Sequence, residues 1–458
     1  MHIQSDRAFI PAGTTSTRYL SVTISAPAAT YSGGSAPRNK RPGVSVSLVL
    51  DRSGSMGGQK INLARQAVAH AIRLLKDDDQ LSVIVYDDEV ETVLERMAAT
   101  KGARQQALTA LARVDARGST NLSDGWFTGA RSLGATAEPG DAATIGNLPL
   151  TFEDAKPAGA AAAVRAEDAD RVRRVLLLTD GLANQGVTDP TALQMASARL
   201  RAQGVSTSTF GLGADFDEEL LTSLASSGGG HFYFIEHPQQ IPDFLASELG
   251  EVLDVVARDV VFEVAAGDAA SVTLLNGLPV EQVGEYAGHS VRVRLGDLVA
   301  EQEVTLVLAV TCSARVEGQK VAVDCRVRDR GGVLFAAPMR VEWSAVPGEQ
   351  DRTQPVNHAV LLEAARMLAE RARIVALAAN RNGEFQQAVL ALDAAIQQIR
   401  ELGVHEAVVN ELIEQLQGEK QVFAHDLSPI DRKARHFASY SLAFSRESGK
   451  ARTTKERR

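Results

Sequence analysis

The sequence predicts an α/β fold in which a doubly wound parallel sheet is inserted into an antiparallel β-sandwich and followed by a C-terminal helical bundle. Three observations support this fold class. Apolar strands alternate with amphipathic helices between residues 42 and 256, as in a parallel sheet covered by helices. Short strands separated by turn signals fill residues 258–343. Helical periodicity returns after residue 355.

The N-terminal residues 1–41 have the character of β-structure. Ala8–Gly13 and Tyr19–Ile24 are short segments rich in residues that favour strands. They do not fit the alternation of strand and helix that follows them. We therefore expect these strands to join the β-sandwich, which makes the parallel-sheet domain an insertion into it.

The parallel-sheet domain, residues 42–256, begins with a nearly continuous apolar run at Val44–Leu50. Such a run, bounded by a turn, is typical of an inner strand that is buried on both faces. Apolar residues then recur at helical spacing from Ile61 to Leu75. Strands are predicted next at Leu81–Tyr86 and Thr92–Leu94, followed by a helix over Arg104–Val114.

The alternation continues to residue 256. Helices are predicted over Asn121–Leu133, Pro190–Gln203, Asp217–Ser226 and Pro238–Val256, and strands over Val175–Thr179, Val205–Phe210 and His231–Ile235, the last at a sheet edge. Residues 135–170 interrupt this pattern with a stretch rich in Ala, Gly and Pro. We expect a flexible insertion there, because loops of this length are usually functional or disordered.

Two of the predicted inner strands end in a carboxylate. Asp51 ends the first strand and is followed closely by the hydroxyls of Ser53 and Ser55, and Asp180 ends a later strand. Between them, Thr120 lies in a polar loop just before a predicted helix. Ligands collect at the carboxyl ends of parallel strands, and hard oxygen atoms suit Mg²⁺ and Mn²⁺. These five side chains are therefore predicted to bind one Mg²⁺ or Mn²⁺.

This pattern resembles the von Willebrand factor A domain, whose metal-ion-dependent adhesion site reads Asp-x-Ser-x-Ser, then Thr, then Asp. The five residues match it in order, and the resemblance covers roughly residues 42–256. It implies a Rossmann-like domain and a cation with an open position, which an Asp or Glu of a partner protein can fill. It also implies that Ser53 and Ser55 bind the ion directly, whereas Thr120, Asp51 and Asp180 do so directly or through water.

A simpler interpretation of residues 51–55 is a polar capping turn, because Asp and Ser hydrogen-bond to nearby backbone and favour helix starts. This alternative explains the first motif alone. It does not explain a second strand-end carboxylate at Asp180 with a hydroxyl loop between the two, so we favour metal binding. Elsewhere, Asp87–Glu89 is interpreted as a solvated turn, and the histidines, His231 included, as surface or partly buried side chains.

The β-sandwich is assigned to residues 257–347. Its strands are predicted at Val260–Val264, Ser271–Leu275, Ser290–Leu295, Val304–Thr311, Val321–Val327 and Met339–Trp343. The helical bundle is assigned to residues 355–425, with helices over Ala359–Asn380, Glu384–Leu402 and His405–Phe423. The C-terminal tail, residues 426–458, is expected to be basic and disordered at its end, from Arg446 onward.

The composition is that of a soluble globular protein, with 458 residues, enough for two or three domains. The net charge of -9 disfavours nonspecific binding of nucleic acid. Cys312 and Cys325 flank a predicted hairpin turn at Glu317–Gln319, where one bridge is possible, but two buried thiols in a reducing compartment are favoured. The sequence shows neither a signal peptide nor a membrane span, so a cytoplasmic location is expected.

The expected function is metal-dependent protein binding, as a module or scaffold, and not catalysis. The usual signatures of hydrolases and nucleotide-binding enzymes are missing. The whole arrangement resembles bacterial A-domain proteins that carry a β-sandwich and a helical tail, related distantly to inter-alpha-trypsin inhibitor heavy chains. That resemblance leaves a regulatory or assembly subunit for a MoxR-type AAA ATPase as an alternative function. A metal-dependent hydrolase is a weaker alternative.

Overall fold

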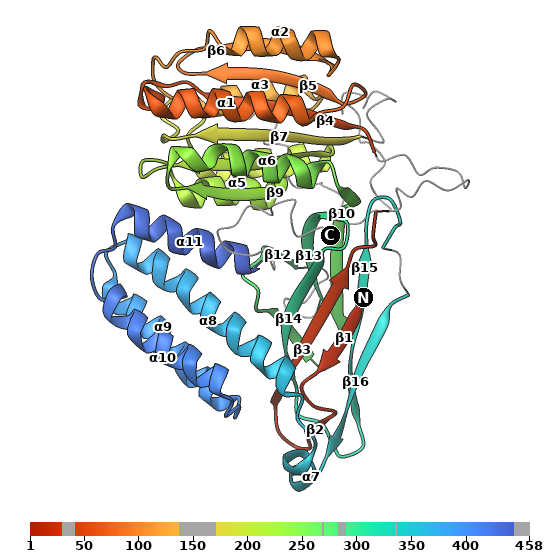
Figure 1. The fold of residues 1–458 in the computed structure, drawn as a ribbon. Helices are drawn as coiled ribbons and strands as arrows, with labels where there is room; N and C mark the ends of the chain where they lie inside the picture. Colours follow the sequence, from red (N-terminus) through yellow and green to blue (C-terminus); the bar gives the residue numbers. More distant parts are fainter. Residues whose placement is uncertain (30–41, 137–170, 268–269, 283–289, 335–336, 444–458) are drawn as a thin grey trace. The chain divides into compact units, whose positions relative to one another are not determined.

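The computed structural model describes residues 1–29, 42–136, 171–267, 270–282, 290–334 and 337–443 (Figure 1). The chain divides into two compact units. The first unit joins Met1–Ala28 to Ala257–Gly449, and the second unit contains Ala29–Val256. Within the described ranges, no helix combines the length and the hydrophobicity of a membrane span.

The second unit is built on a six-stranded sheet with the order β6-β5-β4-β7-β8-β9. Its central strands are β4 (Val44–Asp51) and β7 (Val172–Thr179), in which every residue is buried. Parallel pairing extends to β5 (Gln80–Tyr86), β8 (Val205–Leu212) and β9 (Gly229–Ile235). The edge strand β6 (Val90–Ala98) runs antiparallel to β5, so the sheet is mixed at that edge.

Helices cover this sheet. They are α1 (Gln59–Leu74), α2 (Lys101–Leu111), α3 (Leu122–Ser132), α4 (Pro190–Ala202), α5 (Glu218–Gly228) and α6 (Ile241–Val252). Helix α1 packs beside α6 and α2, whereas α4 packs beside α5. Helix α2 begins three residues before the predicted helix, because Thr100 caps it by accepting a hydrogen bond from the backbone N–H of Ala103.

Two glycines allow α3 to lie close against the sheet strands β4 and β5. A Cβ atom on Gly125 would lie 2.5 Å from the ring of Tyr86, and one on Gly129 would lie 2.4 Å from Cγ2 of Val49. Real Cβ atoms do not approach other atoms so closely. The absence of these side chains therefore sets the position of α3, and with it the position of the Thr120 loop that precedes this helix.

The first unit contains two sheets, with the orders β1-β3-β14-β11 and β12-β13-β10-β15-β16-β2. The N-terminal strands contribute to both. Strand β3 (Ser16–Ser25) pairs antiparallel with β14 (Glu303–Cys312) over its whole length, and β1 (His2–Ser5) pairs with β3. Strand β2 (Phe9–Pro11) pairs parallel with β16 (Met339–Val346) in the second of these sheets. The predicted fold class, with the α/β domain inserted between β-sandwich strands, is confirmed.

The remaining strands of these sheets are β10 (Val255–Ala266), β11 (Ala270–Leu274), β12 (Val280–Gln282), β13 (Ser290–Val299) and β15 (Lys320–Arg328). The hairpin predicted at Glu317–Gln319 is wrong, because β14 and β15 belong to different sheets. Cys312 and Cys325 are both buried free thiols. Burial raises the pKa of Cys312 to about 11 and that of Cys325 to about 12, which keeps both thiols protonated.

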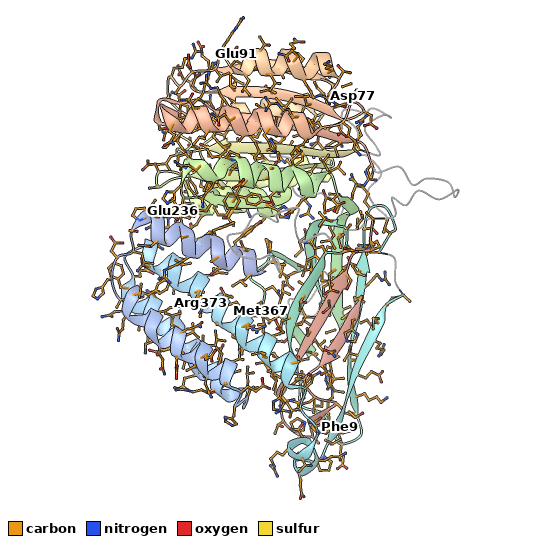
Figure 2. The ribbon with its side chains drawn as sticks, in the orientation of Figure 1. Phe9, Asp77, Glu91, Glu236, Met367 and Arg373 are labelled. Atoms are coloured by element: carbon orange, nitrogen blue, oxygen red, sulfur yellow. The ribbon has the colours of Figure 1, made fainter. Side chains whose placement is uncertain are left out.

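The helices of the first unit are α7 (Gly348–Thr353), α8 (His358–Arg381), α9 (Phe385–Glu401), α10 (Ala407–Phe423) and α11 (Pro429–Ala443). Helix α8 lies on the sheet strands β3 and β14 and packs against α9, α10 and α11. Arg373 on α8, labelled in Figure 2, donates to Glu419 on α10 at 2.9 Å. Residues Leu275 and Val307 of the β-sandwich join the buried cluster of the helices, so the two parts share a core.

Helix α11 corrects the assignment of residues 426–458 to a tail. Ser428 accepts a hydrogen bond from the backbone N–H of Asp431, and Pro429 occupies the first helical position. Phe437 and Tyr440 of this helix are buried. The basic end from Arg446 onward lies outside the described residues, as do residues 137–170 of the predicted insertion.

Candidate metal centre

The two strand-end carboxylates lie side by side at one edge of the sheet. The register pairs Leu50 of β4 with Leu178 of β7, so Asp51 lies beside Thr179, directly before Asp180. Both aspartates are fully buried. The Thr179 hydroxyl donates to Oδ2 of Asp51 at 2.6 Å. The parallel sheet therefore brings together two acidic groups that are more than a hundred residues apart in the chain.

The loop after β4 connects both carboxylates through hydrogen bonds. The backbone N–H of Ser53 donates to Oδ1 of Asp51 at 2.8 Å, which closes a tight turn. The hydroxyl oxygens of Ser53 and Ser55 lie 3.0 Å apart, and the Ser55 hydroxyl donates to Oδ1 of Asp180 at 2.6 Å. Four of the five predicted ligands thus form one hydrogen-bonded group.

Thr120 comes to the same place through backbone contacts between loops. The N–H of Gly54 donates to the carbonyl of Gly118 at 3.0 Å, and the N–H of Asn184 donates to the carbonyl of Thr120 at 3.2 Å. A Cβ atom on Gly181 would lie 3.1 Å from Oγ1 of Thr120. The hydroxyl of Thr120 therefore lies next to the loop that follows Asp180, and the structure brings all five predicted residues together.

The electrostatics of the group fit a divalent cation. Burial raises the pKa of Asp51 to about 6, hydrogen bonds from Thr179 and Ser53 partly oppose this rise, and the neighbouring Asp180 adds to it. Two carboxylates that repel each other in a buried place are stabilised by a nearby positive charge. The oxygen donors, two carboxylates and three hydroxyls, are those that Mg²⁺ and Mn²⁺ favour.

Comparison with known proteins identifies the domain. Residues 44–234 match the sequence family described as von Willebrand factor type A domain. The chain contains a von Willebrand factor type A domain. Domains of this family generally mediate protein–protein interactions, and they often bind a divalent metal at the motif described above.

The similarity extends beyond this domain in individual proteins. The uncharacterized protein YfbK of Escherichia coli is 25% identical over 318 residues, which cover 68% of this chain and 50% of YfbK. This chain therefore spans about half the length of that relative. The human inter-alpha-trypsin inhibitor heavy chain H4 is 25% identical over 232 residues, covering 50% of this chain and 22% of the heavy chain.

A solved structure shares the fold over nearly the whole chain. The von Willebrand factor type A protein from Catenulispora acidiphila superimposes with a TM-score of 0.65. The alignment covers 96% of this chain and 95% of that protein at 16% sequence identity. The likeness therefore includes the β-sandwich and the helices as well as the von Willebrand factor type A domain.

Lys60 belongs to this site but was not predicted from the sequence. It lies in the first turn of α1, and its Nζ atom lies 2.5 Å from Oδ2 of Asp180. The Lys60 side chain is 27% exposed, whereas that of Asp180 is fully buried. The only sequence signal was its position, five residues after Ser55, which brings it within reach of the metal loop once α1 has formed.

A buried ion-pair network supports the same loops and corrects the interpretation of Asp87–Glu89 as a solvated turn. Asp87 is fully buried, and its Oδ2 atom accepts hydrogen bonds from Nε of Arg52 at 2.9 Å and from Nε of Arg117 at 2.7 Å. Burial alone would raise the pKa of Asp87, but the backbone N–H of Glu89 and the two guanidinium groups lower it. The network thereby fixes the Asp51 loop of the von Willebrand factor type A domain to the loop before Thr120.

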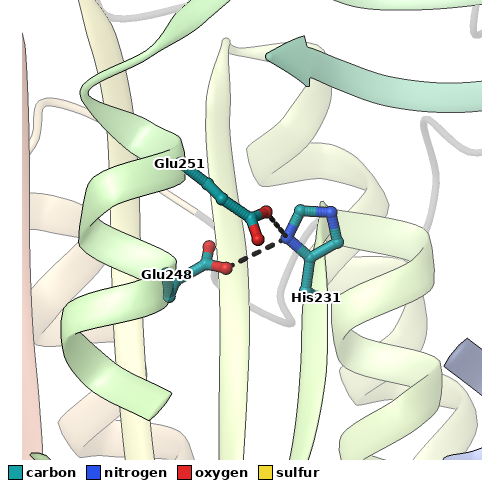
Figure 3. Close-up of side chains that lie close together, drawn as sticks. All are labelled: His231, Glu248 and Glu251. Carbon is teal, nitrogen blue, oxygen red and sulfur yellow. Dashed lines mark hydrogen bonds and ion pairs between the residues drawn. The ribbon is translucent and has the colours of Figure 1, made fainter. Parts of the chain in front are cut away.

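His231 is buried, which also differs from the prediction. Its Nδ1 atom lies 3.0 Å from Oε2 of Glu248 and 3.6 Å from Oε2 of Glu251 on α6 (Figure 3). Glu248 also accepts hydrogen bonds from Arg174, Ser208 and Tyr233. Because Arg174 already compensates the charge of Glu248, we interpret this cluster as structural: it holds α6 on the strands β7, β8 and β9.

Proposed function

We propose that this von Willebrand factor type A domain is a metal-dependent protein-binding module, with Mg²⁺ or Mn²⁺ held by Asp51, Ser53, Ser55, Thr120 and Asp180. The observation that supports the proposal is that three separate loops bring these five oxygen-bearing side chains to one edge of the sheet. A capping turn would explain the Ser53 contact with Asp51 alone. It would not explain the contacts from Ser55 and Thr120 to the Asp180 loop.

The proposed ligands of the cation differ in charge. Ser53 and Ser55 offer neutral oxygens, so the charge of the site comes from Asp51 and Asp180. Thr179 and the backbone of Ser53 hold the Asp51 carboxylate in position. A bound divalent cation would supply a coordination position for a carboxylate oxygen of a partner protein. We therefore propose a partner that presents an Asp or Glu side chain.

Calorimetric titration with Mn²⁺ tests the proposed metal site. Wild-type protein should bind one Mn²⁺, and Asp51→Ala should lose the binding because it removes one of only two carboxylates. Asp243→Ala is the matched control, since Asp243 is an exposed carboxylate on α6 of the same domain. Unchanged Mn²⁺ affinity in Asp51→Ala, in a variant whose circular dichroism is that of the wild type, would refute the site.

Two further functions stay predictions. An assembly subunit for a MoxR-type AAA ATPase would use the same site to dock a different kind of partner, and nucleotide-dependent co-elution with such an ATPase would distinguish it. A metal-dependent hydrolase would use water on the bound cation as its nucleophile. Turnover that is lost in Asp180→Ala would support that function.

A further inference from the structure

The Lys60 ammonium group competes for the same carboxylate that we propose as a metal ligand. Lys60 Nζ contacts Oδ2 of Asp180, while the Ser55 hydroxyl contacts Oδ1. Both oxygens of this buried carboxylate are therefore engaged by residues at the start of α1 or in the loop before it. Any cation that binds Asp180 must either displace the Lys60 contact or bind beside a positive charge.

The position of Lys60 is unfavourable for the helix itself. Cations are disfavoured in the first turn of a helix, where the macrodipole is positive, and the first turn of α1 contains no acidic residue that could offset this effect. Helix stability therefore does not explain a lysine here. The ion pair with Asp180 does explain it, because a buried carboxylate without a compensating charge is costly.

Asp51 and Asp180 together carry two negative charges when ionised, and Lys60 carries one positive charge. A divalent cation would be neutralised by the two aspartates alone, but with Lys60 present the loaded site retains one excess positive charge. The Lys60 ammonium group and a cation on the same Asp180 carboxylate would repel each other, so Lys60 opposes metal binding.

We infer that Lys60 is a built-in competitor that lowers the affinity of the site for divalent cations and leaves the loaded site positively charged, which favours an acidic partner. This inference rests on the proposed function, because it concerns the same metal site. In metal-free protein, Lys60 stabilises the fold by pairing with Asp180. In metal-bound protein, the same charge weakens the hold on the cation and increases the attraction for an external carboxylate.

Mn²⁺ titration of the full-length protein tests this inference with three variants. Lys60→Met removes the charge and should bind Mn²⁺ about tenfold more tightly than wild type. Lys60→Arg keeps the charge and should bind with nearly wild-type affinity. Lys101→Met is the matched control, because Lys101 is an exposed lysine in the first turn of α2, and it should leave the affinity unchanged.

Thermal unfolding provides a second measurement. Without metal, Lys60→Met should melt at a lower temperature than wild type, because Asp180 loses its charge partner. Saturating Mn²⁺ should narrow that difference, because the cation then compensates the carboxylate. Lys60→Gln gives the same comparison if Lys60→Met does not fold.

If wild type binds Mn²⁺ and Lys60→Met binds it equally or more weakly, Lys60 does not compete with the cation, and the inference is overturned while the metal site stands. If neither protein binds Mn²⁺, the metal site itself fails, and the inference fails with it. Binding by Lys60→Met alone would support the competition in its strongest form.

Discussion

Asp51 makes the metal-free domain sensitive to pH. Burial raises its pKa to about 6 from an ordinary value of 3.8. The folded protein therefore holds this proton at pH values where the unfolded chain has released it. The contribution of Asp51 to stability is fully present below about pH 4 and is lost as the pH rises through about 6.

We predict that the loss amounts to about 3 kcal/mol, because one pKa unit corresponds to about 1.4 kcal/mol. Urea denaturation in EDTA at pH 4 and pH 7, an interval that contains most of this loss, measures the effect in wild type and in Asp51→Asn, which cannot ionise at this position. The fall in stability between the two pH values should be smaller in Asp51→Asn. Equal pH dependence in both proteins would show that Asp51 ionises normally in the folded state.

The five oxygen-bearing residues of the candidate metal site could be selected from the sequence, because strand ends and motif order are local features. The charged partners of these residues could not be predicted. Lys60 meets Asp180 because the first turn of α1 lies beside the carboxyl end of β7, and buried Asp87 is paired with Arg52 and Arg117, which approach it from two loops. Pairings of this kind depend on tertiary contacts that no spacing in the chain encodes.

Helix α3 is the element whose placement matters most for the site, since the Thr120 loop leads into it. We predict that Gly129→Ala destabilises the second unit by about 1–3 kcal/mol, because the new methyl group would collide with Val49. Gly102→Ala is the control: it lies in helix α2, where a Cβ atom meets no close neighbour. That substitution should be neutral or slightly stabilising.

Urea denaturation of both variants checks this prediction. Mn²⁺ affinity of folded Gly129→Ala should also fall, because a displaced α3 moves Thr120 away from the Asp180 loop. A Gly129→Ala protein as stable as Gly102→Ala would mean that α3 does not pack as closely against β4 as the structure indicates.

Most elements could be predicted from hydrophobic periodicity, and those that were missed are short or weakly apolar. Strands β1 and β12 have four and three residues, too few for alternation to be recognised. Helix α11 was missed because basic and polar residues dominate its sequence. Ser428 and the proline after it are nevertheless a helix-start signal in the sequence.

The organisation of the whole chain could be predicted from its N-terminal strands, because they do not fit the parallel sheet that follows them and must pair elsewhere. The pairing of β3 with β14 closes the sandwich across nearly three hundred residues. The order of strands within each sheet, and the parallel pairing of β2 with β16, could not be predicted. Both depend on tertiary pairing between strands that are far apart in the sequence. The domain boundaries at residues 41, 256 and 347 stay predictions.

Leu20→Ala tests whether the N-terminal strands stabilise the first unit independently of the metal site. Leu20 is fully buried in β3, and its truncation should cost the first unit about 2–5 kcal/mol. The two tryptophans separate the units: Trp343 reports on the first and Trp126 on the second. In a Trp126→Phe background the fluorescence transition should shift to lower urea, whereas in a Trp343→Phe background it should not.

The measurement that tests the central claim most directly is a pull-down from native lysate, repeated with Mg²⁺ and with EDTA. Wild-type protein and Asp243→Ala should recover the same partner in Mg²⁺ and lose it in EDTA. Thr120→Ala should fold normally and recover little of it in either condition, because it lacks one proposed ligand. A partner retained equally by wild type and Thr120→Ala, with or without EDTA, would contradict metal-dependent binding and place the interaction on another surface of the protein.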